Sequence, residues 1–219
     1  MGELCGRVEF HAVAFELLIF PPTMVDTRLK PNCILAALAG VGFALLVNAQ
    51  AASEMTLFEF SAATNTPAWQ ITNDDVMGGV STSSFRVTNG VGVFRGELSL
   101  ENNGGFASVR SLPVQQNLAG HTAFVVRVRG DGRRYKFTVR TDGGFNSPMY
   151  QCAFTTQRGE WKEHRLAFKD FVPTLRGRVL SDAPALDPAK GISVGFLISD
   201  KQEGSFKLEV AWIKAAGHP

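Results

Sequence analysis

The chain has 219 residues, of which 45% are hydrophobic and 19% charged, and its formal net charge is +2. This length and composition are typical of a globular protein with one sizeable core. The charge is too small to indicate nucleic acid as a partner by itself.

The N-terminal segment has the pattern of a secretory leader. Arg28 and Lys30 precede an apolar run over residues 33–47, and Ala49-Gln-Ala51 then places small residues at the spacing of a cleavage site. The run is shorter than the roughly twenty residues of a membrane-spanning helix. We therefore predict a signal peptide over about 24–51, the alternative being a retained N-terminal anchor. Glutamates ahead of the basic segment are unusual in a leader, so residues 1–23 are interpreted as a possible start-site artefact.

Removal of that leader would leave one domain over residues 52–219 with no membrane span. The leader predicts an exported protein, periplasmic or associated with the outer face of the inner membrane. Cys152 is the one cysteine outside the N-terminal segment, so the domain has no internal disulfide available. Its apolar neighbours Tyr150 and Phe154 share its strand parity, which favours a buried structural thiol.

Apolar and polar residues alternate with a period of two through most of the chain after residue 85, as expected for half-buried strands. Such runs occupy residues 92–100, 106–112, 122–129, 135–139, 149–155, 161–168, 191–198 and 206–212. Clusters of Gly, Asn or Pro separate most of them, and no helical stripe competes. The pattern predicts an all-β fold, namely one antiparallel β-sandwich of eight to ten strands with jelly-roll topology.

The three tryptophans are assigned from this parity and their neighbours. Trp212 alternates in phase with Phe206, Leu208 and Val210, so it and Trp161 are expected in the core. Trp69 stands beside an acidic glycine-rich loop and is instead a surface candidate, as aromatic residues that stack on sugars are.

Two glycine-rich motifs are the strongest local signals. Asn73-Asp-Asp-Val-Met-Gly-Gly-Val-Ser81 follows Trp69, and Leu100-Glu-Asn-Asn-Gly-Gly-Phe106 follows some twenty residues later. Glycine permits positive φ or a close approach by another group, and Asn and Asp bond their own turns. Shaped loops on a β scaffold are a usual place for a binding surface. The alternative is that both motifs are only tight turns.

A third motif is Arg129-Gly-Asp-Gly-Arg-Arg-Tyr135, whose Gly130-Asp-Gly132 is typical of a hairpin turn. Parity then groups Arg127 and Arg129 with Lys136 and Arg140 as a basic face. Such a face suits an anionic partner (a lipid headgroup, an acidic protein surface or an RNA backbone), or serves solubility alone. Residues 171–190 form the one long irregular connection, and their apolar residues predict a loop packed on the domain.

The sequence contains no motif of an enzyme or a transition-metal site. It has no GxSxG, HExxH or CxxC, and its histidines show no paired spacing. Asn73, Asp74, Asp75 and Asp131 offer oxygen ligands for calcium, but their spacing matches no defined calcium loop. We therefore predict no catalytic residues, no metal and no cofactor.

Five ordered blocks also carry a family resemblance. They are Asn73-Asp-Asp-Val-Met-Gly-Gly-Val-Ser81, Leu98-Ser-Leu-Glu-Asn-Asn-Gly-Gly-Phe-Ala107, Arg129-Gly-Asp-Gly-Arg-Arg-Tyr135, Phe171-Val-Pro-Thr-Leu-Arg-Gly-Arg178 and Gly195-Phe-Leu-Ile-Ser-Asp-Lys-Gln-Glu-Gly-Ser-Phe206. Over roughly residues 57–214 the chain resembles the NADH:ubiquinone oxidoreductase complex I intermediate-associated protein 30 family. The resemblance implies a galactose-binding-like jelly roll without known catalysis, which helps to assemble respiratory complex I.

The resulting hypothesis is a non-enzymatic binding module that assists assembly or stability of a membrane protein complex, with a protein as partner. The alternative is an exported carbohydrate-binding module, for which Trp69 and the sandwich are the grounds. The expected partner-binding residues are Trp69, Asp74, Asp75, Met77, Gly78, Gly79, Asn102, Asn103, Gly104, Gly105, Phe106, Asp131, Arg133 and Tyr135.

Overall fold

The computed structural model describes residues 54–60, 68–113, 117–144, 147–190 and 193–217 of the chain. The predicted signal peptide, the alternative anchor and the suspected start-site artefact all lie outside these residues. No helix within the described ranges is long and apolar enough to cross a membrane.

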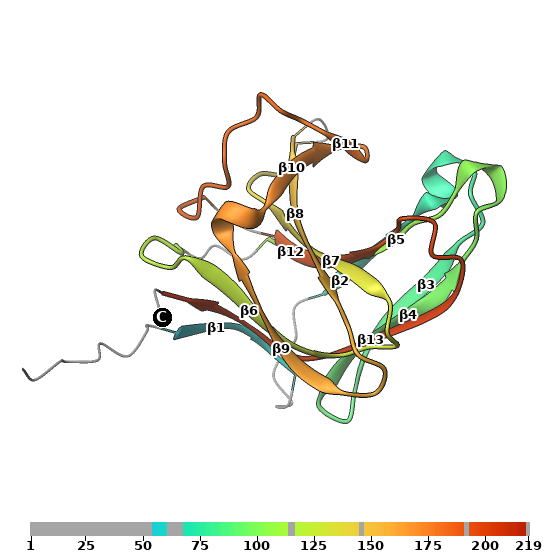
Figure 1. Cartoon of the computed structure of the whole chain (residues 1–219), viewed down its shortest axis with the longest axis horizontal. Helices are drawn as coiled ribbons and strands as arrows, with labels where there is room; N and C mark the ends of the chain where they lie inside the picture. Colours follow the sequence, from blue (N-terminus) through green and yellow to red (C-terminus); the bar gives the residue numbers. More distant parts are fainter. Residues whose placement is uncertain (1–53, 61–67, 114–116, 145–146, 191–192, 218–219) are drawn as a thin grey trace, which may run out of the picture. The chain divides into compact units, whose positions relative to one another are not determined.

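The described residues form thirteen strands in two antiparallel sheets (Figure 1). Sheet A contains β1 (Glu54–Glu59), β3 (Thr82–Thr88), β4 (Val91–Leu98), β6 (Ala123–Arg129), β9 (Trp161–Ala167) and β13 (Gly204–Ala216). Its order is β3-β4-β13-β6-β9, with β1 also paired to β13. Sheet B contains β2 (Trp69–Asn73), β5 (Ala107–Ser111), β7 (Arg134–Arg140), β8 (Met149–Thr155), β10 (Val172–Leu175), β11 (Arg178–Val179) and β12 (Ser193–Ile198). Its order is β11-β10-β8-β7-β12-β5-β2.

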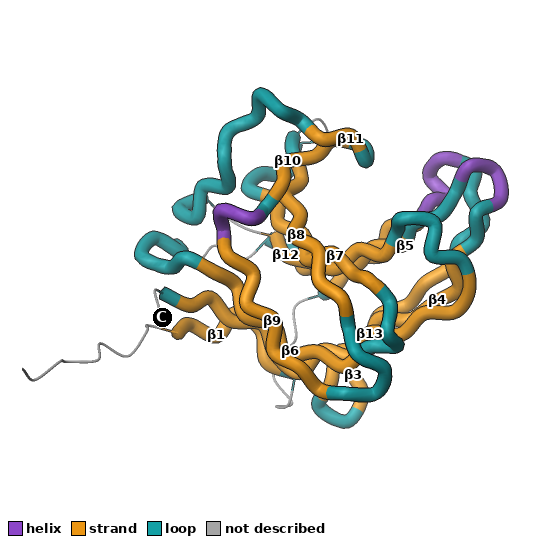
Figure 2. Tube along the Cα trace, in the orientation of Figure 1, coloured by secondary structure: helices purple, strands orange, loops and turns teal. Residues whose placement is uncertain are grey.

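Three single-turn 3-10 helices complete the described elements (Figure 2). They are η1 (Asp74–Met77), η2 (Glu101–Asn103) and η3 (Phe168–Asp170). η1 directly follows β2, η2 precedes β5, and η3 links β9 to β10. Two of the three therefore belong to the glycine-rich motifs.

The core lies between the inner faces of the two sheets and is rich in phenylalanine. Phe94, Phe124, Phe137 and Phe196 are fully buried, and Phe124 packs on Phe137 with ring centroids 5.1 Å apart. Each of these rings comes from a different strand, two strands from each sheet, so the predicted β-sandwich is confirmed. The strand number exceeds eight to ten because β1, β2 and β3 precede the first predicted run and β10 and β11 form inside the connection predicted to be irregular.

The segment after η3 packs against the domain, as its apolar residues indicated. Phe171 and Leu186 are buried, and the Tyr150 hydroxyl donates to the Pro184 carbonyl oxygen at 3.2 Å. Cys152 is also buried, and burial, reinforced by the charge of Asp170, raises the pKa of its thiol. A raised pKa disfavours the reactive thiolate.

A β-bulge in β13 overturns the expected position of Trp212. Val210 pairs with Val128 while Trp212 pairs with Arg127, so one residue of β13 is unmatched at this point. The extra residue reverses the parity and turns Trp212 to the outer face, where Lys214 Nζ lies 4.6 Å from its ring centroid. Trp161, also expected in the core, is half-buried beneath Arg129, whose guanidinium carbon lies 5.0 Å from the ring centroid.

The predicted hairpin at Gly130-Asp-Gly132 is also corrected. β6 belongs to sheet A and β7 to sheet B, so the chain crosses between the layers at these glycines. Arg127 and Arg129 consequently lie on one sheet while Lys136 and Arg140 lie on the other. The basic face expected from these four residues does not form, because parity along the chain says nothing about which sheet a strand joins.

Candidate functional site

The two glycine-rich motifs meet at the buried carboxylate of Asp74, which has no exposed surface. Its Oδ1 accepts a hydrogen bond from Ser81 N at 2.9 Å, and its Oδ2 accepts one from Ser81 Oγ at 2.5 Å. Oδ2 also accepts from Gly105 N at 2.6 Å and Phe106 N at 3.2 Å. One side chain thus joins residues 74–81 to residues 99–106. We call these two segments the clamped loop pair.

The ionised form of Asp74 is favoured by these hydrogen bonds. Burial opposes ionisation, but donation from Ser81, Gly105 and Phe106 outweighs it and holds the pKa of Asp74 below its ordinary value. Because protein donors occupy both carboxylate oxygens, Asp74 is engaged internally. Within the described residues no group of three or more His, Cys, Asp or Glu side chains is placed to hold a metal ion.

Two further contacts fix the two loops to each other, and a third closes the base of the first loop. Asn102 Nδ2 donates to the Gly78 carbonyl oxygen at 3.1 Å, and Ser99 N donates to Ser81 Oγ at 3.0 Å. Ser83 Oγ donates to Asn73 Oδ1 at 2.6 Å at the base of the pair. Asn102 and Asn103 both adopt positive φ, a conformation that asparagine tolerates better than most residues. In Figure 2, η1 and η2 lie next to each other at one end of the domain.

The glycines of the motifs serve this packing in two different ways. Gly78 and Gly105 have φ of +89° and +118°, which other residues rarely adopt. Gly79 and Gly104 lie outside that region, but a methyl group on Gly79 would be 2.4 Å from Asp74 Cγ. On Gly104 it would be 2.6 Å from Asp74 Oδ2. Each glycine therefore has a structural reason within the loops, and the close approach that the sequence suggested is made by Asp74.

The clamped loop pair nevertheless presents an apolar tip. Val76, Met77 and Val80 are 68%, 65% and 48% exposed, and they fall within five consecutive residues. Asp75 beside them is exposed, and its Oδ1 accepts from Val76 N at 3.0 Å. We call Val76, Met77 and Val80 the apolar tip. A rigid loop that holds clustered apolar side chains in water is a typical protein-contact feature.

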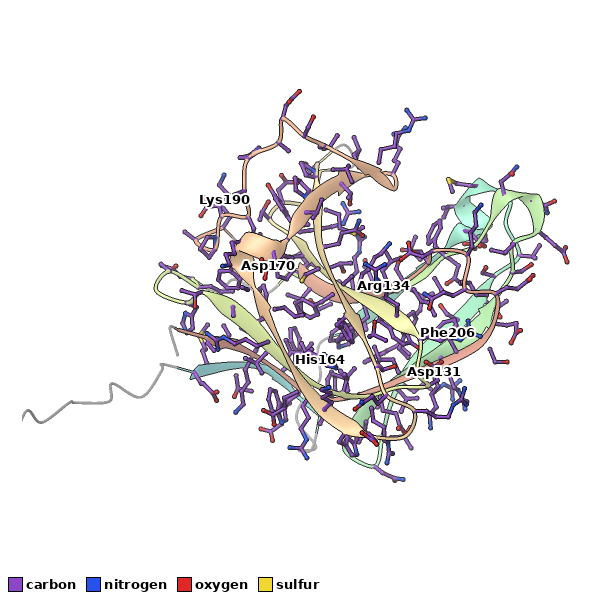
Figure 3. The ribbon with its side chains drawn as sticks, viewed as in Figure 1. Asp131, Arg134, His164, Asp170, Lys190 and Phe206 are labelled. Carbon is purple, nitrogen blue, oxygen red and sulfur yellow. The ribbon has the colours of Figure 1, made fainter. Side chains whose placement is uncertain are left out.

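The Arg129–Tyr135 motif forms a second internal junction. Asp131 Oδ2 accepts from the Tyr135 hydroxyl at 3.0 Å and from Lys207 N on β13 at 2.9 Å. Figure 3 shows Asp131 close to β13 and to Phe206. Arg133 donates to the carbonyl oxygens of Gln202 and Glu203. Tyr135 has no exposed surface, and burial together with Asp131 raises its hydroxyl pKa, so it stays protonated.

Trp69 is half-buried and packs against the core rather than standing free on the surface as expected of a sugar-stacking residue. Its ring centroid is 4.8 Å from that of Phe85 and 5.2 Å from that of Phe58. Of the expected partner-binding residues, the structure thus leaves Asp75, Met77, Gly78, Asn102 and Asn103 exposed. It buries Asp74 and Tyr135 completely. Sequence reasoning missed Ser81, the hydroxyl that completes the clamp, and Val76 and Val80 of the apolar tip.

The described residues thus form a two-layer antiparallel sandwich with a hydrogen-bonded loop pair at one end. The model of the family "Complex I intermediate-associated protein 30" matches residues 58–210, and the chain belongs to this family. The proteins of that name from Drosophila melanogaster and Mus musculus are 26% and 28% identical over 180 and 178 residues. Each alignment covers 72% of this chain, and 61% and 54% of the relative, so the chain spans little more than half of their length.

Solved structures show the same architecture. The family 11 carbohydrate-binding module of a cellulosomal cellulase from Clostridium thermocellum superposes with a TM-score of 0.59 at 16% identity. The match covers 77% of this chain and 96% of that module. This confirms the jelly-roll sandwich of the galactose-binding-like type, and at this identity it extends to the fold alone.

The comparisons correct the expected localisation. The matched relatives from fly, mouse and Neurospora crassa are named as mitochondrial proteins, which conflicts with an exported, periplasmic protein. The expectation rested on a basic segment followed by a short apolar run. Targeting segments of more than one kind combine basic and apolar residues, so the leader pattern by itself did not discriminate between destinations.

Proposed function

We propose that this chain is a non-enzymatic binding module that assists the assembly or stability of a membrane protein complex of the complex I type. Its family membership supports that role. The observation that carries the site is the clamped loop pair, in which a buried carboxylate fixes two loops and leaves the apolar tip exposed. The apolar tip supplies the anchor of the protein interface, and the exposed polar groups of Asp75 and Asn102 form its rim.

The hydrogen bonds of Asp74 stabilise the clamped loop pair, whereas the apolar tip becomes favourable only in a complex. Four hydrogen bonds to one carboxylate restrict the loops in the free protein, so little conformational entropy is lost when a partner binds. Clustered exposed apolar side chains, by contrast, contribute nothing to folding and become favourable only when a partner covers them.

The carbohydrate-binding alternative loses its main ground in this chain. It depended on Trp69 as a surface ring, and that ring packs among Phe58, Phe60 and Phe85. The likeness to a carbohydrate-binding module is one of fold, and fold does not transfer a ligand.

The test is complementation of a native host that lacks the chain. A Val76→Ser/Met77→Ser variant is compared with a Val87→Ser/Val179→Ser variant. The second variant also removes two exposed apolar side chains, but from β3 and β11. We expect the tip variant to lower the amount of assembled membrane complex on native gels at least fivefold, with an unchanged melting temperature. The control variant should restore the complex fully. Full restoration by the tip variant would refute the assignment of this surface.

A further inference from the structure

The outer face of sheet B carries a continuous row of polar residues. Gln70, Arg110, Gly195, Thr138 and Gln151 stand opposite one another across β2, β5, β12, β7 and β8. Their chain neighbours Val109, Phe137 and Phe196 are fully buried, so the row points away from the core. At about 4.8 Å between strands, the row is roughly 19 Å long. Thr138 is buried, with 6% of its surface exposed, whereas Gln151 is half-buried and makes no side-chain hydrogen bond with any described residue.

Arg140 lies beside this row on β7, opposite Ser193, and is half-buried. Among the described residues its guanidinium has neither a hydrogen-bond partner nor an ion pair. Burial first, and then the positive charge of Arg110, lower the pKa of Arg140, and Asp142 only partly opposes them. Arg110 is hydrogen-bonded to the neutral Gln70 Oε1, at 3.3 Å from Nε and 3.1 Å from Nη2. Arg110 and Arg140 thus share this face, neither forms an ion pair among the described residues, and the charge of Asp142 offsets only part of their repulsion.

Other partly buried cations of this domain form ion pairs with carboxylates. On the same face Lys136 Nζ lies 2.6 Å from Asp200 Oδ1, and on sheet A Arg129 Nε lies 2.5 Å from Glu209 Oε2. A half-buried guanidinium beside a like charge destabilises a fold, and a neutral residue of similar size would avoid this penalty. The fold therefore gives no reason for Arg140 next to Arg110, whereas an anionic ligand does.

We propose that the outer face of sheet B binds an extended acidic segment of the protein partner, with Arg110 and Arg140 pairing with its carboxylates. This deepens the proposed function and rests on it, because the ligand is taken to be protein. Guanidinium groups bind carboxylates through paired N–H donors, and the half-buried amide of Gln151 supplies hydrogen bonds to a peptide backbone. No aromatic residue has outward parity in the described strands of sheet B, so the face lacks a platform for sugar rings or bases.

The position of the row agrees with this assignment. It runs across the strands towards β5 and β2, which directly adjoin η2 and η1 of the clamped loop pair. Figure 1 shows β10 and β11 at one end of sheet B and these loops at the other. The row ends at Gln70 on β2, three residues before Asn73, where β2 ends and η1 follows, so a partner segment that turns along β2 approaches the clamped loop pair.

The test measures binding of fluorescent hexaglutamate and hexaglutamine peptides to the purified chain by anisotropy. Arg110→Gln and Arg140→Gln are compared with Arg86→Gln, which removes the same charge from an exposed position of β3 on sheet A. We expect the wild type to prefer hexaglutamate. Each sheet B variant should bind it about tenfold more weakly, and the double variant about a hundredfold. Arg86→Gln should stay within twofold of wild type, and affinity should fall as salt rises.

Stability measurements separate binding from folding. Arg140→Gln should melt at the same temperature as wild type or higher, because it removes an unneutralised charge. Arg140→Lys, which keeps the charge without the paired donors, should lose part of the affinity. Equal binding of the two peptides, or equal loss in Arg86→Gln, would overturn the proposal. An Arg-dependent preference for oligogalacturonate over hexaglutamate would assign the face to an acidic glycan and would also overturn it. None of these results depends on the tip variants, so the proposed function stands or falls separately.

Discussion

The Asp74 and Asp131 junctions are alike in sequence and differ in what they leave exposed. Each is an aspartate next to glycine-rich sequence, and each accepts hydrogen bonds from segments distant in the chain. Asp74 holds two loops whose apolar tip reaches into solvent. Asp131 holds the crossing between β6 and β7 against β13 and a buried Tyr135.

The comparison shows that a glycine-rich motif with an aspartate can either expose a surface or hold the two sheets together. Glycines and acids mark the places where the backbone is constrained, and both junctions have them. Only the surroundings decide whether that constraint presents a surface to a partner or closes the sandwich. The following predictions test whether the two junctions differ in strength and in consequence.

The largest effect is expected from Asp74→Asn. An amide cannot accept all four hydrogen bonds, and its NH₂ group would face backbone donors in a buried position. We expect a loss of about 3 kcal/mol or more in the free energy of unfolding, measured with urea. Asp75→Asn makes the same change at the exposed neighbour and should stay within about 0.5 kcal/mol of wild type. Similar losses in the two variants would show that Asp74 is not a clamp.

Alanine at Gly79 or Gly104 should destabilise the domain by about 1–3 kcal/mol, because the new methyl group overlaps the Asp74 carboxylate. Gly143 has no atom within 4 Å of the added methyl position and no positive φ, so Gly143→Ala is the control and should be near neutral. Thermal melts of the three variants decide this. If Gly79→Ala and Gly104→Ala melt like wild type but lose partner binding, the glycines serve the partner directly.

A smaller effect is expected at the second junction. Tyr135→Phe removes one hydroxyl bond to Asp131 and should cost about 1 kcal/mol of stability. Because this junction presents no contact surface in our account, membrane complex assembly in the native host should be unchanged. Loss of assembly with an unchanged melting temperature would place the Asp131 junction in the interface after all.

The smallest effect is a difference in acid sensitivity. The pKa of Asp74 is lower in the folded than in the unfolded chain, so its ionised form stabilises the domain above about pH 4. That contribution disappears as pH falls from there through the folded pKa. The stability gap between wild type and Asp74→Asn should therefore narrow with acidification in urea titrations between pH 6 and 2. A gap independent of pH would contradict the assigned ionisation state.

The sequence by itself determined the fold class, most strand positions and the family. Period-two alternation depends on local chemistry, since each strand must bury one face whatever its neighbours are. The glycine-rich motifs could also be predicted from the sequence, because Gly, Asn and Asp are the residues that adopt the backbone conformations of tight turns.

Tertiary structure alone decided which of these residues are buried and which are exposed. Trp212 lies on the outer face because a bulge in β13 reverses parity, and Trp69 is half-buried because its ring packs against phenylalanines of the core edge. Arg140 met Arg110 rather than Arg127 and Arg129, because β6 and β7 join different sheets. Asp74 became internal because donors more than thirty residues away close over it. Register, sheet membership and burial arise from contacts between distant segments, and a local pattern does not contain them.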